Sequence, residues 1–352
     1  MIMSVRILYH RYRAGAIQSR GWARMGRPRR GRCAARALLT LCVLSIALAA
    51  CGRTHPVVGV VPKGSHHLFW RTVHAGAAKA GLEFGLEIEW QAPESEANLE
   101  GQIDIVSSMI NRRLSGIALA PIDKKALVPV VKRAVERGIP VAIFDSGLES
   151  EDFVSYVATD NAGAGRLAAR RMGKVLNGNG TVAIVSFMPG SAATIEREQA
   201  FQDELRLLFP EIRVVAFQYG MADWSKAELS TESILEAHPK LSGIFADNES
   251  SSIGAMRALK KRGAQQVKLV AFDCSDELVD ALKAGHVDSL VVQDPFRMGY
   301  ETVRVLAQKL KGRQPRTFVD SGVRLVVAED LESSDVRELL FPKLDSYLSA
   351  KR

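Results

Sequence analysis

Residues 138–146 read Gly-Ile-Pro-Val-Ala-Ile-Phe-Asp-Ser, and this stretch decides the fold class of the chain. The glycine and proline end the helical pattern of residues 124–137, because glycine is common just past a helix end and proline cannot continue a helix. The apolar residues Val141–Phe144 do not alternate with polar ones, which predicts a strand buried on both faces of a parallel sheet. Asp145 and Ser146 then stand at the carboxyl end of that strand. A helix, a buried strand and a polar strand end are typical of an α/β protein.

The same unit recurs along the chain. We predict strands at Val57–Val61, Leu86–Trp90, Gly116–Leu119, Val141–Phe144, Val154–Ala158, Thr181–Val185, Ile212–Phe217, Gly243–Phe245, Val267–Phe272 and Ser289–Val292. Segments with a helical period of 3.6 residues separate them, such as Glu249–Arg262, which Asp247 or Asn248 precedes as N-cap and Gly263 follows. This alternation favours right-handed crossovers. Ten strands are too many for one compact sheet, so we predict two doubly wound, Rossmann-like parallel-sheet domains.

One glycine motif resembles a nucleotide-binding fingerprint. Residues 163–168 match G-x-G-x-x-A, follow a strand and open a helix. A dinucleotide site also needs an acidic residue about 20 residues later, and residues 182–186 contain none. We therefore interpret the motif as small residues that let a helix pack closely on its sheet, with Asp160 or Asn161 as the cap.

Residues 1–50 have the pattern of a bacterial secretory signal peptide: an arginine-rich part, an apolar run at 37–50 and small residues before Cys51. The run is shorter than the ~18–20 apolar residues of a membrane-spanning helix. Leu-Ala-Ala-Cys at 48–51 resembles a lipobox, so we expect Cys51 to carry a lipid and to anchor a periplasmic or cell-surface protein to the membrane. An ordinary signal peptide with Cys51 as an incidental thiol is the alternative. Met25 is an alternative start.

The positive charge of the chain lies almost entirely in that leader. Residues 1–50 hold ten arginines and no acidic residue, so 37 basic residues face 39 acidic ones in the remainder. A net charge near −2 argues against nucleic-acid binding. Cys274 is the only cysteine after Cys51. His66, His67 and His74 lie close to one another in the sequence, but no nearby acid or thiol completes a metal site. We expect no metal and no cofactor.

Polar and aromatic side chains follow the predicted strands at their carboxyl ends, where ligands bind in doubly wound sheets. They are Lys63, His66, His67, Phe69, Trp70, Asp145, Ser146, Arg197, Trp224, Asp247, Asn248, Asp273 and Gln293. Planar Asp, Asn, Gln and Arg groups can each make paired hydrogen bonds to neighbouring hydroxyls. Aromatic rings can cover the C–H faces of a sugar. These residue types indicate a small polyhydroxylated ligand.

An ordered set of motifs adds a family resemblance over Val57 to about Asp330. The motifs are Phe69-Trp70, Gly138 to Asp145, Thr159-Asp-Asn161, Arg197-Glu-Gln-Ala-Phe201, Ile244 to Asn248, Val270-Ala-Phe-Asp273 and Gln293-Asp-Pro295. With them the chain resembles the periplasmic ribose- and galactose-type substrate-binding proteins of ABC importers. The resemblance implies the type I periplasmic binding protein fold, with lobes at 56–159 plus 294–321 and at 160–293 plus 322–352, joined by a three-strand hinge that closes on the ligand.

The resemblance also implies ligand contacts, at Phe69, Trp70, Asp145, Arg197, Trp224, Asn248, Asp273 and Gln293. Ser146 stands where ribose binders usually have arginine, His67 where they have asparagine, and Trp224 where they have phenylalanine, which argues against ribose itself. Lys63 leaves open a ligand with a carboxylate or phosphate. Each contact has a structural alternative: the two aspartates could cap helices, the adjacent aromatics could be core residues, and Arg197 could form a surface salt bridge.

We therefore expect a monomeric, non-enzymatic receptor that captures a sugar, polyol or similar small molecule and delivers it to an ABC permease. A sensory receptor for a chemotaxis or two-component system is the alternative. A LacI-type repressor would need an N-terminal helix-turn-helix, where this chain has the signal pattern. The sequence contains no G-x-S-x-G, H-E-x-x-H or P-loop motif.

Overall fold

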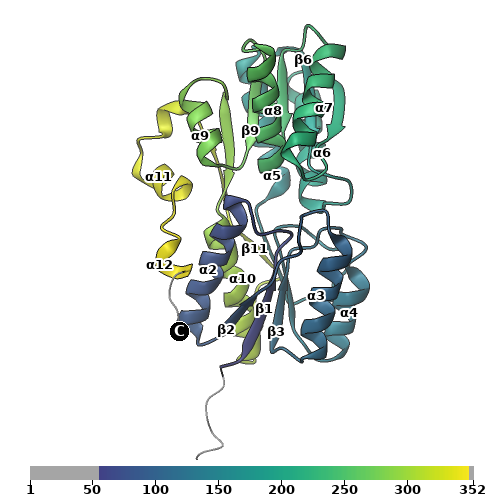
Figure 1. Ribbon diagram of the computed structural model, residues 1–352, viewed down its shortest axis with the longest axis vertical. Coiled ribbons are helices and arrows are strands. Elements are labelled where there is room, and N and C mark those ends of the chain that lie inside the picture. Colours follow the sequence, from purple (N-terminus) through teal and green to yellow (C-terminus); the bar gives the residue numbers. More distant parts are fainter. Residues whose placement is uncertain (1–54, 349–352) are drawn as a thin grey trace, which may run out of the picture. The chain divides into compact units, whose positions relative to one another are not determined.

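A computed structural model describes residues 55–348 of this protein (Figure 1). The signal peptide predicted at residues 1–50, the alternative start Met25 and the expected lipidation site Cys51 lie outside the described residues. Within residues 55–348, every helix is too short or too polar to cross a membrane.

The described chain alternates strands and helices around two six-stranded sheets. The first sheet contains β1 (Val57–Val61), β2 (Glu87–Trp90), β3 (Gly116–Leu119), β4 (Val141–Phe144), β5 (Ser155–Ala158) and β11 (Phe318–Asp320). With α2 (Leu68–Phe84), α3 (Leu99–Asn111), α4 (Val128–Glu136) and α10 (Pro295–Leu310) it forms what we call the N-terminal lobe.

The C-terminal lobe is built around the second sheet. Its strands are β6 (Asn179–Ser186), β7 (Glu211–Tyr219), β8 (Gly243–Ala246), β9 (Lys268–Phe272), β10 (Ser289–Gln293) and β12 (Val323–Val326). Its helices are α5 (Asn161–Val175), α6 (Ala192–Leu208), α7 (Trp224–Ala237), α8 (Glu249–Arg262), α9 (Asp276–Lys283) and α11 (Ser334–Leu340). The short η1 (Ala328–Asp330) and α12 (Asp345–Leu348) complete the described chain.

Both sheets have the same arrangement of strands. The first has the order β11-β5-β4-β3-β1-β2 and the second the order β12-β10-β9-β8-β6-β7. All pairs are parallel except β10 with β12. The chain passes from one sheet to the other three times, after β5, after β10 and between β11 and β12. The predicted fold of two doubly wound sheets with three connections is confirmed.

Helices cover both faces of each sheet, and this explains the unbroken apolar runs. In β4, Phe144 packs in the cluster of α2 and α10, whereas its neighbour Ile143 packs in the cluster of α3 and α4. In β9, Val270 packs against α5 and α6, and Ala271 packs against α8 and α9. Because successive side chains of a strand point to opposite faces, a strand covered on both sides needs apolar residues at every position.

The ten predicted strands are present, and the prediction missed β11 and β12. These two are short strands at the sheet edges, where Phe318 is 45% exposed and the side chains of Val323–Leu325 are half-buried. An edge strand has one neighbour and one open side, so it lacks the continuous apolar run on which the prediction depends.

The C-terminal segment contacts both lobes. In α11, Val336 and Leu340 are buried in the core of the C-terminal lobe. Farther on, α12 packs against α2 of the N-terminal lobe, and the Tyr347 ring lies 5.3 Å from the ring of Phe296 (Figure 1). The predicted boundary assigns 322–352 to the C-terminal lobe, whereas α12 contacts the N-terminal lobe.

The glycine motif at 163–168 is part of helix packing. Asp160 is the N-cap of α5, and its carboxylate accepts a hydrogen bond from the backbone N–H of Gly163. A Cβ at Gly165 would lie 2.2 Å from the backbone oxygen of Arg197 in α6. The close approach at Gly165 is therefore between two helices, whereas Ala164 and Ala168 of the same motif pack against the sheet as predicted.

This contact gives the first prediction. Gly165→Ala should destabilise the protein by about 1–2 kcal/mol, because a Cβ this close to a backbone oxygen puts the cost of overpacking in the upper part of its range of about 1–3 kcal/mol, whereas alanine gains only ~1 kcal/mol in helix propensity. Urea unfolding followed by circular dichroism measures the change. Arg166→Ala, at a side chain 43% exposed in the same helix, is the control and should leave stability nearly unchanged. A stabilised Gly165→Ala variant would contradict the prediction.

Candidate functional site

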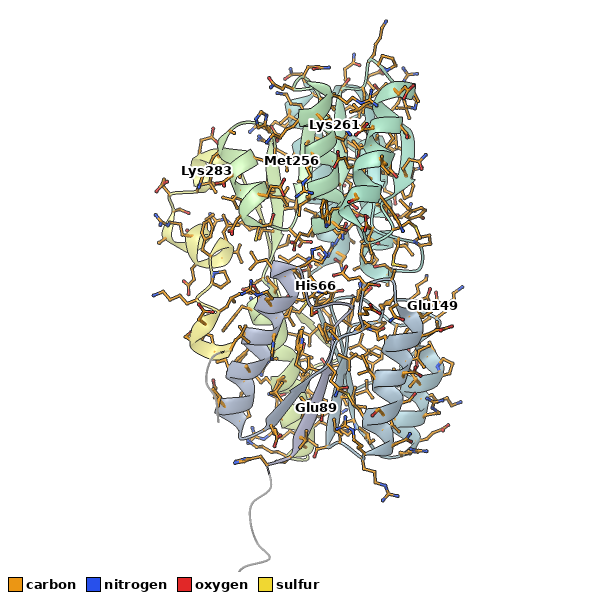
Figure 2. All side chains as sticks on the ribbon, in the orientation of Figure 1. His66, Glu89, Glu149, Met256, Lys261 and Lys283 are labelled. Atoms are coloured by element: carbon orange, nitrogen blue, oxygen red, sulfur yellow. The ribbon has the colours of Figure 1, made fainter. Side chains whose placement is uncertain are left out.

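A cavity lies between the two lobes, at the carboxyl ends of strands from both sheets. Its lining residues are Lys63, His67, Phe69, Trp70, Glu96 and Asp145 from the N-terminal lobe, and Phe187, Ala193, Thr194, Arg197, Asn248, Glu249, Asp273 and Gln293 from the C-terminal lobe. Its empty volume is about 410 Å³, including space open to solvent. Figure 2 shows His66, the neighbour of the cavity residue His67, at the level where the lobes meet.

Two aspartates occupy equivalent positions in the two lobes. Asp145 directly follows β4 and Asp273 directly follows β9. Each has a positive φ, 61° and 65°, and each donates its backbone N–H to the neighbouring strand, to Val157 O at 3.0 Å and to Val291 O at 2.9 Å. Non-glycine residues in the left-handed region are uncommon and cluster at functional sites. Both sheets thus aim a buried carboxylate into the same cavity.

Asp145 forms a buried ion pair with Lys63. The Lys63 Nζ lies 2.8 Å from Asp145 Oδ2, and both side chains are at least nine-tenths buried. The same ammonium group is 3.4 Å from the hydroxyl of Ser191 in the other lobe and 5.6 Å from the centre of the Phe187 ring. Because the positive charge of Lys63 is already paired, it offers an anionic ligand little net attraction.

Arg197 is fixed by contacts on several sides. Its Nε donates to Asn161 Oδ1, and its two terminal nitrogens donate to the backbone oxygen of Asp247 and to Gln293 Oε1, each at 2.9 Å. The guanidinium carbon lies 3.8 Å from the centre of the Phe272 ring. These bonds use three of the five N–H donors of the side chain, which leaves two for a ligand. Arg197 is 2% exposed, so it forms no surface salt bridge.

Asp273 belongs to the same hydrogen-bond network. Its Oδ1 accepts from Gln293 Nε2 at 2.7 Å, and its Oδ2 accepts from the backbone N–H of Glu249 at 3.1 Å. Asp273 does not cap the helix that follows it, since Ser275 is the N-cap of α9. Burial raises the pKa of Asp273 to about 6, although Arg197 and Gln293 act in the opposite direction.

A second pair of acids lies behind Arg197. Burial, together with the neighbouring carboxylate of Glu198, raises the pKa of Asp247 well above its usual range. Glu198 accepts a hydrogen bond from the Ser186 hydroxyl, and Arg197 contacts the backbone of Asp247. Two buried carboxyl groups this close favour a shared proton, because ionising both would place two negative charges in a medium of low dielectric constant.

His67 lies between two carboxylates of different lobes. Its Nδ1 is 3.2 Å from Glu249 Oε1 and its Nε2 is 3.8 Å from Glu96 Oε1. Glu96 also accepts a hydrogen bond from Trp70 Nε1. Burial lowers the pKa of His67, but its hydrogen bond to Glu249 and the charges of Glu96, Glu249 and Asp273 outweigh burial and raise the pKa to about 9. The imidazole is therefore protonated at neutral pH.

This contact gives a prediction for the pH dependence of stability. The pKa of His67 is higher in the folded protein, about 9, than its ordinary value of 6.5. Its contribution to the free energy of unfolding is therefore full below pH 6.5, and it is lost as the pH rises towards 9; the loss is about 3 kcal/mol at most. Urea unfolding between pH 6 and 9.5 measures this. The free energy of unfolding of the wild type should exceed that of His67→Gln at pH 6, and the difference should shrink as the pH rises. The matched control is His66→Gln, at the exposed neighbouring histidine. A constant difference between wild type and His67→Gln across this range would contradict the prediction.

The sequence comparisons agree with this two-lobed geometry. A family model described as a periplasmic binding protein domain matches residues 58–314. The chain belongs to the periplasmic binding protein family. It is 26% identical over 292 residues to the ribose import binding protein RbsB of Salmonella typhimurium, covering 83% of this chain and 97% of that protein. It is 28% identical over 286 residues to a D-ribose/D-allose-binding protein of Pseudomonas aeruginosa, and this match covers 78% of this chain and 89% of that protein.

Solved structures of sugar-bound proteins share the fold of this family member. A carbohydrate transporter solute-binding protein from Agrobacterium radiobacter, in complex with D-arabinose, matches with a TM-score of 0.80 and 28% identity over 82% of this chain and 100% of that one. An ABC transporter solute-binding protein from Agrobacterium vitis, with bound D-fucose, matches with a TM-score of 0.78 and 32% identity. This match covers 81% of this chain and 100% of that one.

Most of the residues expected at the site of this periplasmic binding protein line the cavity. These are Lys63, His67, Phe69, Trp70, Asp145, Arg197, Asn248, Asp273 and Gln293. The two aromatics are both core and cavity residues, since they pack in the cluster of α2 and α10 as well. Asn248 also caps α8 by accepting from the backbone N–H of Ser251.

Four of the residues that follow predicted strands do not line the cavity. His66 is exposed and Asp247 is fully buried, and the other two are Trp224 and Ser146. Trp224 is 45% exposed at the first turn of α7, and its ring packs against Arg257 of α8, 4.1 Å from ring centre to guanidinium carbon. The expectation that it lines the cavity is therefore corrected: its ring is held on the surface by a neighbouring helix. Ser146 is fully buried, and its hydroxyl accepts from the backbone N–H of Ala193 at 3.1 Å, so it joins the two lobes beside the cavity.

Five further residues line the cavity without having been predicted, namely Glu96, Phe187, Ala193, Thr194 and Glu249. Phe187 directly follows β6 and Glu249 directly follows Asn248, so both lie within three residues of the end of a strand. Glu96 lies six residues beyond β2, in a loop without regular structure, and its contact with His67 depends on the packing of that loop.

Proposed function

We propose that this protein is an extracytoplasmic solute-binding protein that captures a sugar or polyol between its lobes and delivers it to an ABC importer. One observation carries the proposal: equivalent strand ends of both lobes converge on one cavity with carboxylate, amide and guanidinium groups beside Phe69 and Trp70. Such groups pair with ligand hydroxyls, and the rings cover C–H faces. The sugar-bound relatives support the same class of ligand.

Direct contacts between the lobes suit a closed state of this receptor. Besides His67 with Glu249 and Ser146 with Ala193, the backbone N–H of Lys124 donates to Gly190 O at 3.0 Å. A ligand that contacts both lobes adds to these bonds only when the lobes are closed, so it shifts the equilibrium towards closure. Closure would present both lobes of a monomer to the permease.

The charges around the cavity argue against an anionic ligand. Four carboxylates face the cavity, from Glu96, Asp145, Glu249 and Asp273, against the cations Lys63, His67 and Arg197. Lys63 is already paired with Asp145. The carboxylates accept hydrogen bonds from groups such as ligand hydroxyls, and they repel phosphate or carboxylate groups.

A thermal-shift screen of the purified full chain tests the function, using aldoses, amino sugars, polyols, sugar acids and sugar phosphates. A ligand at a hundred times its Kd should add about 2.7 kcal/mol to stability. We expect stabilisation by a neutral or cationic sugar or polyol. Stabilisation only by acids or phosphates would contradict the ligand class, and no stabilisation by any sugar or polyol would contradict the function.

The expected membrane anchor is a separate part of the proposal. Cys51, in the Leu-Ala-Ala-Cys stretch at 48–51, would carry the lipid and hold the receptor at the membrane. Metabolic labelling of the full chain with a radioactive fatty acid should label the wild type and leave Cys51→Ser unlabelled, with Cys274→Ser as the control. Equal labelling of wild type and Cys51→Ser would contradict the anchor.

A further inference from the structure

One corner of the cavity contains two carboxylates and a single cation. Glu96 of the N-terminal lobe and Glu249 of the C-terminal lobe both face the imidazole of His67, at 3.8 Å and 3.2 Å. The pKa of His67, about 9, makes it one positive charge at neutral pH. When both carboxylates are ionised, this corner has one negative charge in excess.

The remaining charges of the cavity are matched locally. Asp145 is paired with Lys63 at 2.8 Å. Asp273 is linked to Arg197 through the amide of Gln293, which donates to Asp273 Oδ1 and accepts from the guanidinium. The unmatched negative charge is therefore located at Glu96 and Glu249, and not spread over the whole cavity.

Glu249 also has a carboxylate oxygen without a partner. Its side chain is 8% exposed, and Oε2 forms no hydrogen bond with any described residue, whereas Oε1 faces His67. The side chain lines the cavity. A buried carboxylate oxygen that lacks a donor is costly, so a donor that enters the cavity and reaches it should bind strongly.

We propose that the ligand is a sugar or polyol that carries a protonated amino group, and that Glu249 Oε2 receives this group. This proposal rests on the proposed function and adds a ligand class to it. An ammonium group supplies both the missing donor and the missing positive charge, and a charged hydrogen bond is roughly twice as strong as a neutral one. Glu249 then determines specificity, because it distinguishes an amino sugar from its hydroxyl parent.

A proton on Glu96 would offset the excess charge without a cationic ligand. Burial raises the pKa of Glu96, although His67, Trp70 and Lys63 act in the opposite direction. With Glu96 neutral, the corner would hold one carboxylate and one imidazolium, and a neutral sugar would bind as well as an amino sugar. The two arrangements therefore predict different ligand preferences at neutral pH.

Calorimetric titration of the full chain at pH 7 with matched sugars tests the proposal. The probes are glucosamine, galactosamine and mannosamine, each with its neutral parent hexose and its N-acetyl derivative, which keeps an N–H but has no charge. We expect at least one amino sugar to bind about tenfold or more tightly than its parent, a difference of about 1.4 kcal/mol. Equal or tighter binding of the parent in every series would overturn the proposal.

The variant Glu249→Gln keeps the shape of the side chain and removes its charge. It should lose most of the preference for the amino sugar, measured as the ratio of the two dissociation constants for the amino sugar and its parent hexose on the same variant. Glu277→Gln, at a side chain 42% exposed and paired with Arg257 outside the cavity, is the control and should keep the preference. A preference for the amino sugar that survives Glu249→Gln would overturn the role of this residue. The comparison of sugars on the wild type tests the ligand class even if the variant fails to fold.

The outcomes also separate this proposal from the proposed function. Binding of neutral hexoses without preference for the amino forms would leave the solute-binding function in place and overturn the ligand class. Absence of binding to every sugar in this panel and in the wider thermal-shift screen would overturn both.

Discussion

Arg197→Ala is expected to lower the affinity for the ligand at least about 100-fold, roughly 3 kcal/mol. The substitution removes a guanidinium group that lines the cavity and has two further N–H donors, and it removes three bonds that hold Asn161, the backbone of Asp247 and Gln293. Gln293 in turn holds Asp273, so the loss extends to a second contact. Isothermal titration with the sugar found in the screen measures the effect.

The same substitution should also reduce the free energy of unfolding by about 3 kcal/mol, because it leaves buried acceptors without donors. Arg206→Ala, in the same helix, removes an exposed arginine that pairs with Asp203 on the surface, and we expect it to change neither affinity nor stability noticeably. Undiminished ligand affinity in Arg197→Ala would show that the guanidinium is outside the binding site.

Phe245→Ala is expected to cost the C-terminal lobe about 3–5 kcal/mol of stability. Phe245 is fully buried in β8, and its ring is stacked on that of Phe201 from α6, with centroids 4.4 Å apart and an angle of 15°. Alanine would leave a cavity between the sheet and α6, and Arg197 is on the same helix. Ligand affinity should therefore fall together with stability.

Urea unfolding followed by both tryptophan fluorescence and circular dichroism tests this prediction, since the two signals diverge if one lobe unfolds before the other. Phe318→Ala is the control, because that ring lies on the edge strand β11 and is 45% exposed. We expect its effect to stay below ~1 kcal/mol. Equal destabilisation by the two variants would mean that the buried ring pair has no special role.

Much of the fold follows from local sequence. The unbroken apolar runs predicted ten strands, since a strand covered by helices on both faces must be apolar at every position. The polar residue after each run marked the site, because parallel strands of one sheet end at the same edge. Asp145 and Asp273 are the clearest cases, and both line the cavity.

Other features depend on contacts between distant segments, which no local pattern contains. Trp224 lies five residues beyond the end of β7, and packing against Arg257 holds its ring on the surface. Glu96 reaches His67 only through the path of an irregular loop. Gly165 packs against the backbone of Arg197 in a neighbouring helix, and a local motif does not identify its partner.

By itself, the sequence determined that the chain forms two sheets covered by helices, with polar residues at the carboxyl ends of the strands. The hydrophobic period and the strand ends are local properties of the sequence. The tertiary structure alone showed that the two sheets have the same strand order without an evident sequence repeat. It also decided that His67 and Glu96 of one lobe meet Glu249 of the other. Such a meeting requires side chains more than 150 residues apart to approach within hydrogen-bonding distance, and only the packing of the whole chain brings them together.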